Sequence, residues 1–187
     1  MLVIKIFMCV ILADFITGLV HWIEDTYGVP DWPFGLGKNV VEPNIIHHQH
    51  PNWMITMSNA IQRNYITAIP ASIAIFIAYY FYGWSCWPFA TTILIAGFLG
   101  NEIHGWNHTP ISKLNWFIKF LQDTAIVQTR HQHALHHKKP YNKYYCTITN
   151  LTNPVLELIY FWRTLEFLLL KIFGLKTKRC TEVRNGY

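Results

Sequence analysis

Residues 64–101 read NYITAIPASIAIFIAYYFYGWSCWPFATTILIAGFLGN, a stretch of 38 residues without a single Asp, Glu, Lys, Arg or His. A helix that crosses a bilayer needs about 20 mostly apolar residues, so this length suits two crossings joined by a tight turn. The turn is expected between Gly83 and Pro88, because both residue types interrupt helices. Trp84 and Trp87 beside it are typical of the interface between lipid and water. The stretch therefore predicts a helical hairpin within a membrane.

The composition of the whole chain agrees with a lipid environment. Of 187 residues, 52% are hydrophobic and only 13% are charged, whereas soluble chains carry roughly 25% charged residues. The length suits one domain, which we expect over residues 1–175, followed by a polar and disordered tail over 176–187. The basic residues form no long run, which argues against nucleic-acid binding. The four cysteines form no CxxC pair, so a disulfide framework and a zinc ribbon are both disfavoured.

Two further apolar stretches flank the hairpin. Residues 1–22 are interrupted only by Lys5 and Asp14 and lack a clear signal-peptide cleavage site, so we interpret them as a retained span. An acid inside a span usually faces the protein interior or a functional path, and this is expected for Asp14. Residues 154–175 contain four charges and are a weaker candidate, consistent with an amphipathic helix at the interface. The predicted fold is thus an all-α membrane protein with three to four transmembrane helices.

The path of the chain places the histidines on one side of the membrane. His21 ends the first span, and the next histidines lie in the polar segment that follows it. The uncharged hairpin then crosses the membrane and returns, so that the later histidines begin on the same side. All ten histidines are therefore expected on one face. Fourteen of the fifteen Lys and Arg residues, all but Lys5, lie there too, which predicts a multi-pass protein with this face in the cytoplasm.

The spacing of the histidines predicts a metal centre. His104 and His108 are four residues apart, so on a helix both rings lie on one face and can reach one metal. The histidines at 133, 136 and 137 form a second such cluster, and those at 47 and 48 form a third. Imidazole ligands suit Zn, Cu, Fe and Ni. One tetrahedral zinc uses four ligands, so eight or more histidines favour two metals. The chain contains no HExxH and no ExxH motif, which leaves a histidine-rich di-iron centre as the preferred interpretation.

With these motifs in place, the sequence resembles the Kua/CarF lipid desaturase family over residues 13–166. The shared residues include a signature around His21, an HHxxP element, an NxxHxWxH element, the HxxHH cluster and a segment that follows this cluster. They are Asp14, Phe15, Gly18, His21, Trp22, Asp25, Thr26, Gly28, Pro43, His47, His48, Pro51, Asn101, His104, Trp106, His108, Leu121, Gln122, Asp123, His133, His136, His137, Pro140, Tyr144, Tyr145, Cys146, Asn153, Pro154, Leu156, Glu157 and residues 161–166.

The resemblance implies a membrane-bound enzyme that uses O2 and two iron ions to desaturate a phospholipid alkyl or acyl chain. It also implies an external electron donor such as cytochrome b5 or ferredoxin. Two alternatives from the residues alone are an O2-dependent lipid hydroxylase and a non-catalytic membrane metal-binding protein. The iron ligands that the resemblance implies are His21, His47, His48, His104, His108, His133, His136 and His137.

Six further residues are candidates for supporting roles around the metals. Asp25 is expected to orient a ligating imidazole or to be a ligand itself. Asn101, Glu102 and Asp123 are weaker candidates for the layer of side chains behind the ligands. His50 and His131 stand where the family tends to have other residue types, so we expect them to lie outside the ligand set, solvated or behind it.

Overall fold

The computed structural model describes residues 2–56 and 60–179, and every regular element among them is a helix. The all-α prediction is therefore confirmed for this part of the chain. The α-helices are α1 (Leu2–Tyr27), α2 (Glu42–Gln49), α3 (Ala60–Tyr82), α4 (Trp87–His108), α5 (Trp116–Asp123), α6 (Arg130–His136), α7 (Thr152–Leu158) and α8 (Phe161–Phe173). Short π or 3-10 segments are η1 (Gly37–Val41), η2 (Pro51–Thr56), η3 (Gly83–Cys86) and η4 (Ile111–Lys113).

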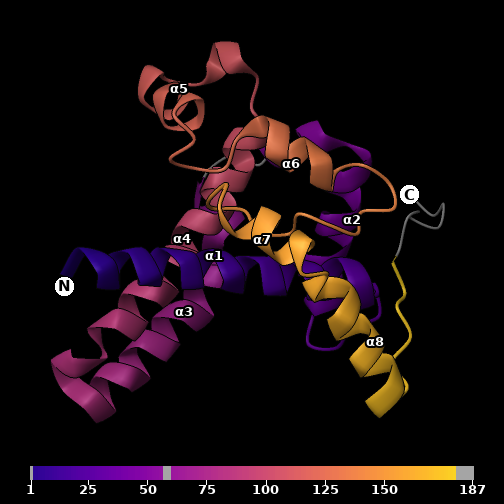
Figure 1. The fold of residues 1–187 in the computed structure, drawn as a ribbon, viewed down its shortest axis with the longest axis horizontal. Helices are drawn as coiled ribbons and strands as arrows, with labels where there is room; N and C mark the ends of the chain where they lie inside the picture. The colour runs from indigo at the N-terminus through magenta and orange to yellow at the C-terminus, as the bar shows by residue number, and fades with distance from the viewer. Residues whose placement is uncertain (1, 57–59, 180–187) are drawn as a thin grey trace.

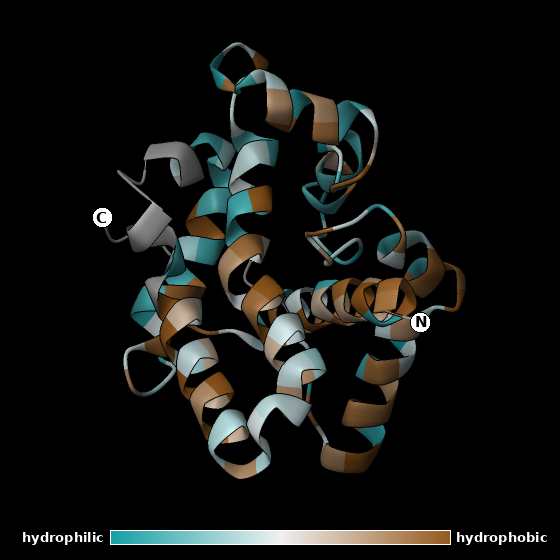
Figure 2. Cartoon of the chain, turned by 90° about the vertical axis from the view of Figure 1, so that its left-hand side faces the viewer, coloured by the Kyte–Doolittle hydropathy of each residue, from teal (hydrophilic) through white to brown (hydrophobic). Residues whose placement is uncertain are grey.

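Helices α3 and α4 form the predicted hairpin, and η3 makes its turn (Figure 1). The two helices approach closely where Gly97 faces Ala71, because a Cβ at Gly97 would lie only 2.6 Å from the Ala71 Cβ. The Thr67 hydroxyl donates to the Gly97 carbonyl at 2.8 Å beside this contact. Small residues at such crossings are how helices pack tightly within lipid. Figure 2 shows the hairpin as mostly apolar, with more hydrophilic residues toward the opposite end of the molecule.

Two segments are long and apolar enough to cross a membrane, judged by length and composition: α1, and residues 66–108 of the hairpin. They indicate a membrane protein. The stretch 154–175, the weaker candidate, is divided between α7 and α8, and the chain turns at Tyr160 with φ 53°. The 13 residues of α8 extend about 20 Å, less than the roughly 30 Å of a hydrocarbon core. Helix α8 by itself is therefore shorter than the hydrocarbon core.

Helix α1 crosses α4 and carries the buried acid that the sequence placed in the interior. A Cβ at Gly100 of α4 would lie 2.8 Å from the Thr17 Cγ2, so this glycine permits the crossing. Asp14 is fully buried, and its carboxylate accepts hydrogen bonds from the Ile148 amide at 2.7 Å and the Thr149 hydroxyl at 2.6 Å. The predicted interior position of Asp14 is confirmed, and its observed contacts tie α1 to the segment before α7.

That segment, residues 141–149, has no regular structure and runs through the core. Tyr145 and Cys146 are fully buried and pack with Trp22 and Trp162. A Cβ at Gly18 would collide with the Cys146 side chain, so Gly18 is what lets the segment approach α1. Its backbone groups are paired by buried amide side chains. The bonds include Cys146 N to Asn153 Oδ1 at 2.9 Å and two bonds to the Cys146 carbonyl, from Asn153 Nδ2 at 2.8 Å and from Gln128 Nε2 at 2.6 Å.

The last described residues return to the body of the molecule. The Lys178 amide donates to the Thr26 carbonyl at 2.7 Å, and the Arg179 guanidinium forms an ion pair with Glu166 of α8. Residues 176–179 of the tail predicted as disordered thus contact α1 and α8, and residues 180–187 lie outside the described residues.

Candidate metal centre

Eight histidines from four helices converge at one place. They lie in the last two turns of their helices or directly after them, where the partial negative charge of a helix C-terminus favours cations. Helix α1 contributes one, α2 two, α4 two and the α6 region three, and all are buried or partly buried. The members are His21, His47, His48, His104, His108, His133, His136 and His137. The structure thus brings together the whole set that the family resemblance implies.

Four of these histidines form an all-histidine group. The nitrogens that His47, His104, His108 and His137 offer all lie within 4.8 Å of one another. His133 joins this group, because its Nε2 lies 2.8 Å from the His108 Nε2 and 3.0 Å from the His137 Nε2. Lone pairs that face one another at such distances are suited to share a cation.

The other three histidines form a mixed group with Asp25. The ligand atoms of His21, Asp25, His48 and His136 also lie within 4.8 Å of one another. Asp25 Oδ2 is 3.4 Å from the His136 Nε2 and 3.8 Å from the His21 Nε2. The His48 Nε2 is 3.0 Å from the His136 Nε2. Asp25, expected either to orient an imidazole or to be a ligand, therefore has its carboxylate among the rings.

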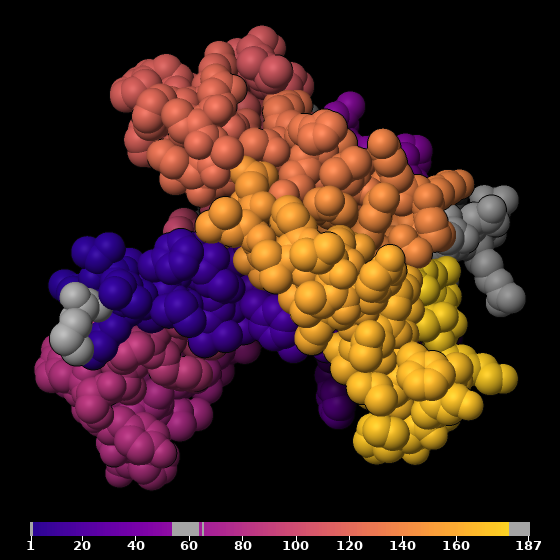
Figure 3. Space-filling model, viewed as in Figure 1, coloured from indigo at the N-terminus to yellow at the C-terminus, as the bar shows by residue number. Residues whose placement is uncertain are grey.

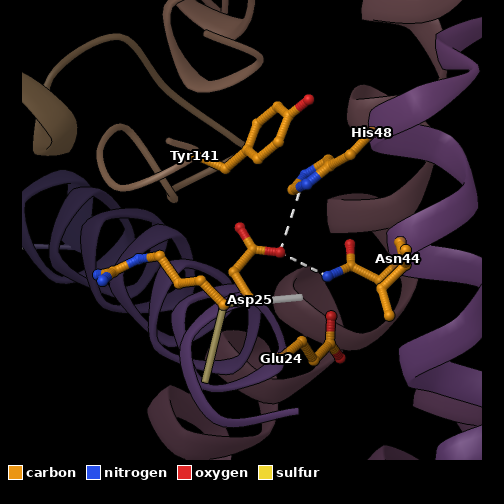
Figure 4. A pocket seen from close by; sticks show the side chains of 7 residues that line it. Glu24, Asp25, Asn44, His48 and Tyr141 are labelled. Atoms are coloured by element: carbon orange, nitrogen blue, oxygen red, sulfur yellow. Dashed lines mark hydrogen bonds and ion pairs between the residues drawn. The ribbon is translucent and has the colours of Figure 1, made fainter. Parts of the chain in front are cut away.

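Backbone carbonyls and one amide orient the mixed group. The His21 Nδ1 lies 3.1 Å from the Tyr145 carbonyl oxygen, and the His136 Nδ1 lies 2.9 Å from that of Lys143. An Nδ1–H bonded in this way leaves the Nε2 lone pair for a metal. Asn44 of α2 donates to Asp25 Oδ1 at 2.5 Å, as Figure 4 shows, and leaves Oδ2 to face the histidines.

Buried polar atoms without partners point to bound cations. The Nε2 atoms of His21, His47 and His104 and the Oδ2 of Asp25 are buried and have no hydrogen-bond partner among the described residues. Each unsatisfied buried group costs about 1–3 kcal/mol. Four such atoms in one cluster are explained if they are ligands. A donor set of imidazoles with one carboxylate fits iron, and it also fits zinc and copper. The residues present therefore fit a two-metal centre.

The protonation of the histidines agrees with this role. Burial lowers the pKa of His47, His48 and His133 well below the usual value, and the neighbouring imidazoles lower it further. Burial lowers the pKa of His136 to about 4. The rings are neutral at pH 7, which is the form that binds a metal.

The remaining predicted candidates lie outside both groups. His50 and His131 are exposed, and Asp123 is exposed at the end of α5. Asn101 and Glu102 make contacts to α3: the Asn101 Nδ2 lies 3.4 Å from the Thr67 hydroxyl, and Asn64 Nδ2 donates to Glu102 at 2.7 Å. Among the described residues, neither metal-binding group includes any of these five.

Some groups that contact the candidate metal ligands were not predicted from the sequence. Asn44 stands three residues before His47, so helical spacing alone could have placed it on the ligand face. Tyr141 stacks on the His48 ring with 4.6 Å between centroids, and Figure 4 shows both beside Asp25. The carbonyls of residues 143 and 145 leave no signal in the sequence, because every residue has one.

The apolar helices and the two buried groups of possible metal ligands define a class, membrane proteins with a candidate metal site, and comparison with known proteins gives the family. Residues 10–180 match the lipid desaturase domain family. The chain belongs to this family, as its histidine motifs predicted. No solved structure matches it.

Several curated relatives are similar over most of the chain. Plasmanylethanolamine desaturase 1 of Mus musculus is 36% identical over 90% of this chain and 65% of its own length. Plasmanylethanolamine desaturase of Myxococcus xanthus is 32% identical over 87% of this chain and 58% of its own length. The chloroplastic fatty acid desaturase 4 of Arabidopsis thaliana is 32% identical over 95% of this chain and 54% of its own length. The chain thus spans less than two thirds of these relatives.

Proposed function

We propose that the protein is a membrane-bound, O2-dependent lipid desaturase with two histidine-ligated iron ions. The observation that carries this proposal is the pair of adjacent buried groups, each with ligand atoms within 4.8 Å of one another. The names of the relatives support a lipid desaturase, and plasmanylethanolamine desaturases are among them. The substrate is accordingly an alkyl or acyl chain of a membrane phospholipid.

Two iron ions would supply the activation of O2 that an unactivated C–H bond requires. Removal of one hydrogen from each of two adjacent carbons, with O2, two electrons and two protons, gives a double bond and two waters. The electrons come from an external donor of the cytochrome b5 or ferredoxin class. The all-histidine group and the mixed group would each hold one iron, with Asp25 as the single carboxylate ligand.

The protein's own groups orient and bury the ligands. The carbonyls of Lys143 and Tyr145 hold two rings with their Nε2 atoms inward, and Asn44 holds Asp25. Helices α1 and α4 are mostly apolar before they reach their histidines, so a lipid chain beside them would meet the metals at the end of the apolar region. The distribution of Lys and Arg favours the cytoplasmic side for this end, in a multi-pass topology.

Expression in a host that lacks the activity, followed by lipid mass spectrometry with and without O2, tests the proposal. Desaturation appears as a product two hydrogens lighter, formed only with O2. A vinyl ether product identifies an alkyl substrate, and a new acyl double bond identifies an acyl substrate. A product heavier by one oxygen would make the protein a hydroxylase. Stoichiometric iron without any lipid product would make it a non-catalytic metal binder and overturn the proposal.

A further inference from the structure

Helix α8 has one side in the core, and much of its remaining surface is exposed among the residues that the structure describes. On the inner face, Trp162 is 2% exposed and lies with its ring centroid 5.6 Å from that of Trp22 and 5.1 Å from that of Tyr145. Glu166 accepts a hydrogen bond from the Trp22 indole at 3.2 Å. Tyr145 in turn contacts the His21 and His136 rings. Only one layer of aromatic side chains therefore separates α8 from the mixed group.

The C-terminal half of α8 is strongly apolar and exposed. Phe167, Ile172 and Phe173 are 57%, 66% and 67% exposed, and Leu168 and Leu170 are each 43% exposed. In Figure 3 the helix and the residues after it protrude at the lower right of the molecule. An exposed apolar surface of this size is unusual on a protein that faces only water. Such a surface marks an interaction site.

Basic residues accompany this apolar face. Lys171, Lys176 and Lys178 are exposed and form no ion pair with any described residue. A groove of about 400 Å³ lies between α8 and the returning chain, with Phe167, Leu170 and Leu175 among its apolar lining and Lys176 at its edge. The one acid in its lining, Glu166, is neutralised by Arg163 and Arg179. The surface therefore combines apolar side chains with an excess of positive charge.

We propose that residues 161–178 form an in-plane membrane anchor that prefers anionic phospholipids. The exposed apolar side chains in the C-terminal half of α8 enter the boundary between headgroups and acyl chains, and the three lysines bind the phosphate groups around them. A short helix with a bulky apolar face and flanking lysines matches this mode of binding. Each lysine near an anionic membrane surface strengthens binding to that surface about fivefold. This inference rests on the membrane location in the proposed function and adds the position of α8 within it.

The anchor has a consequence for the catalytic centre. Because α8 packs through Trp162 against Trp22 and Tyr145, its depth in the bilayer fixes the depth of His21 and His136. The metals would then lie at the level of the headgroups, where a lipid chain can reach them from the apolar side and a soluble electron donor from the other.

The test measures which lipids touch α8 in the full chain. A fluorescent amino acid is incorporated at Phe173, or at Phe76 of α3 as a membrane control, or at Lys138 as a control on the polar end. Each protein is reconstituted into vesicles that contain brominated phosphatidylglycerol or brominated phosphatidylcholine at equal mole fraction. We expect quenching at 173 and 76 but not at 138, and at least about twofold stronger quenching at 173 by phosphatidylglycerol.

Replacement of the lysines tests the selectivity. We expect the two lipids to quench the probe at 173 equally in the triple variant Lys171→Gln, Lys176→Gln, Lys178→Gln. The probe should keep its stronger quenching by phosphatidylglycerol in the matched triple variant Lys38→Gln, Lys138→Gln, Lys139→Gln. Equal quenching in the unmodified protein would overturn the anionic preference. If the probe at 76 is quenched and the probe at 173 is not, the proposed anchor is wrong while the membrane location stands. This result is expected if a second copy of the chain, rather than lipid, covers α8. Unquenched probes at both positions would overturn the membrane location itself.

Discussion

The two metal-binding groups lie side by side but are built differently. In the all-histidine group the His133 Nε2 lies 2.8 Å from the His108 Nε2 and 3.0 Å from the His137 Nε2. In the mixed group, His21 and His136 are fixed from behind by backbone carbonyls, and Asn44 fixes Asp25. The first group has four or five neutral ligands, while the second has three neutral ligands and one carboxylate. A carboxylate stabilises the higher charge of a metal, so the two positions differ in the cation they favour.

The orientation of the rings also differs. Within the described part of the chain, the Nδ1 atoms of His133 and His137 are buried without a hydrogen-bond partner, whereas those of His21 and His136 have one. The mixed group is therefore organised by the fold before a metal arrives. The all-histidine group depends more on the metal to hold its rings in place.

The largest effect is expected from loss of a ligand in the all-histidine group. His104→Ala should remove metal from this group and lower desaturation at least 100-fold, because its Nε2 is buried and faces the other ligands. His50→Ala and His131→Ala are matched controls and should stay within about twofold, since both side chains are exposed. Iron content by mass spectrometry and lipid product are measured together. Full activity with full iron content in His104→Ala would remove this histidine from the ligand set.

Replacement of Asp25 distinguishes the two metal-binding groups, because it removes a ligand from one of them. Asp25→Ala should lower the iron content from two to about one per chain, because only the mixed group contains this residue. The spectrum of the remaining iron should be that of an all-imidazole site, which Mössbauer spectroscopy can show. Retention of two irons would mean that Asp25 acts only as a hydrogen-bond partner.

The pH dependence of the metal-free protein probes the burial of the rings. The pKa of His136 is about 4 in the folded protein and about 6.5 in an unfolded chain. As the pH falls through this window, only the unfolded state gains the proton, so the folded state loses about 1.4 kcal/mol per pH unit for each such histidine. The stability is complete above pH 6.5 and falls toward pH 4. Denaturant unfolding at several pH values measures this slope, and a flat profile would contradict the buried, neutral assignment.

The smallest effect is expected from the side chain that supports Asp25. Asn44→Ala removes the donor to Asp25 Oδ1, and loss of such a support typically weakens metal affinity about 10–100-fold. Competition with a chelator should release one iron earlier and leave the other unchanged. Asn39→Ala serves as the control, because Asn39 is an exposed asparagine that stands five residues before Asn44 in the sequence. Equal weakening of both irons would show that the two groups do not act separately.

Much of the fold could be predicted because it follows from composition. The hairpin needs only 38 uncharged residues with Gly and Pro at the centre, and the turn at η3 lies there. The end of α7 was not predicted, because the positive φ of Tyr160 is imposed by packing and leaves no pattern. Glu102 was expected near the metals because it stands close to His104 in sequence. Residues two apart point to different faces of a helix, and Glu102 contacts Asn64 of α3 instead.

The convergence of eight histidines could be predicted from spacing, family resemblance and chain path, but their division into two groups could not. His136 and His137 are neighbours in sequence and belong to different groups, as do His47 and His48. Adjacent helical residues point about 100° apart, so a pair at the end of a helix can serve two metals. Which ring turns to which metal depends on how α1, α2, α4 and α6 cross, and this is a property of the packed structure.

The carbonyls behind His21 and His136 have a consequence for protein design. They belong to the main chain, so sequence drift at residues 143 and 145 can leave both hydrogen bonds unchanged as long as the path of the chain is kept. That path needs the missing side chain of Gly18, against which Cys146 packs. A designer who copied only the histidines into another helical bundle would reproduce the ligands without the hydrogen bonds that orient their rings. The transplantable unit includes a glycine with no chemistry of its own.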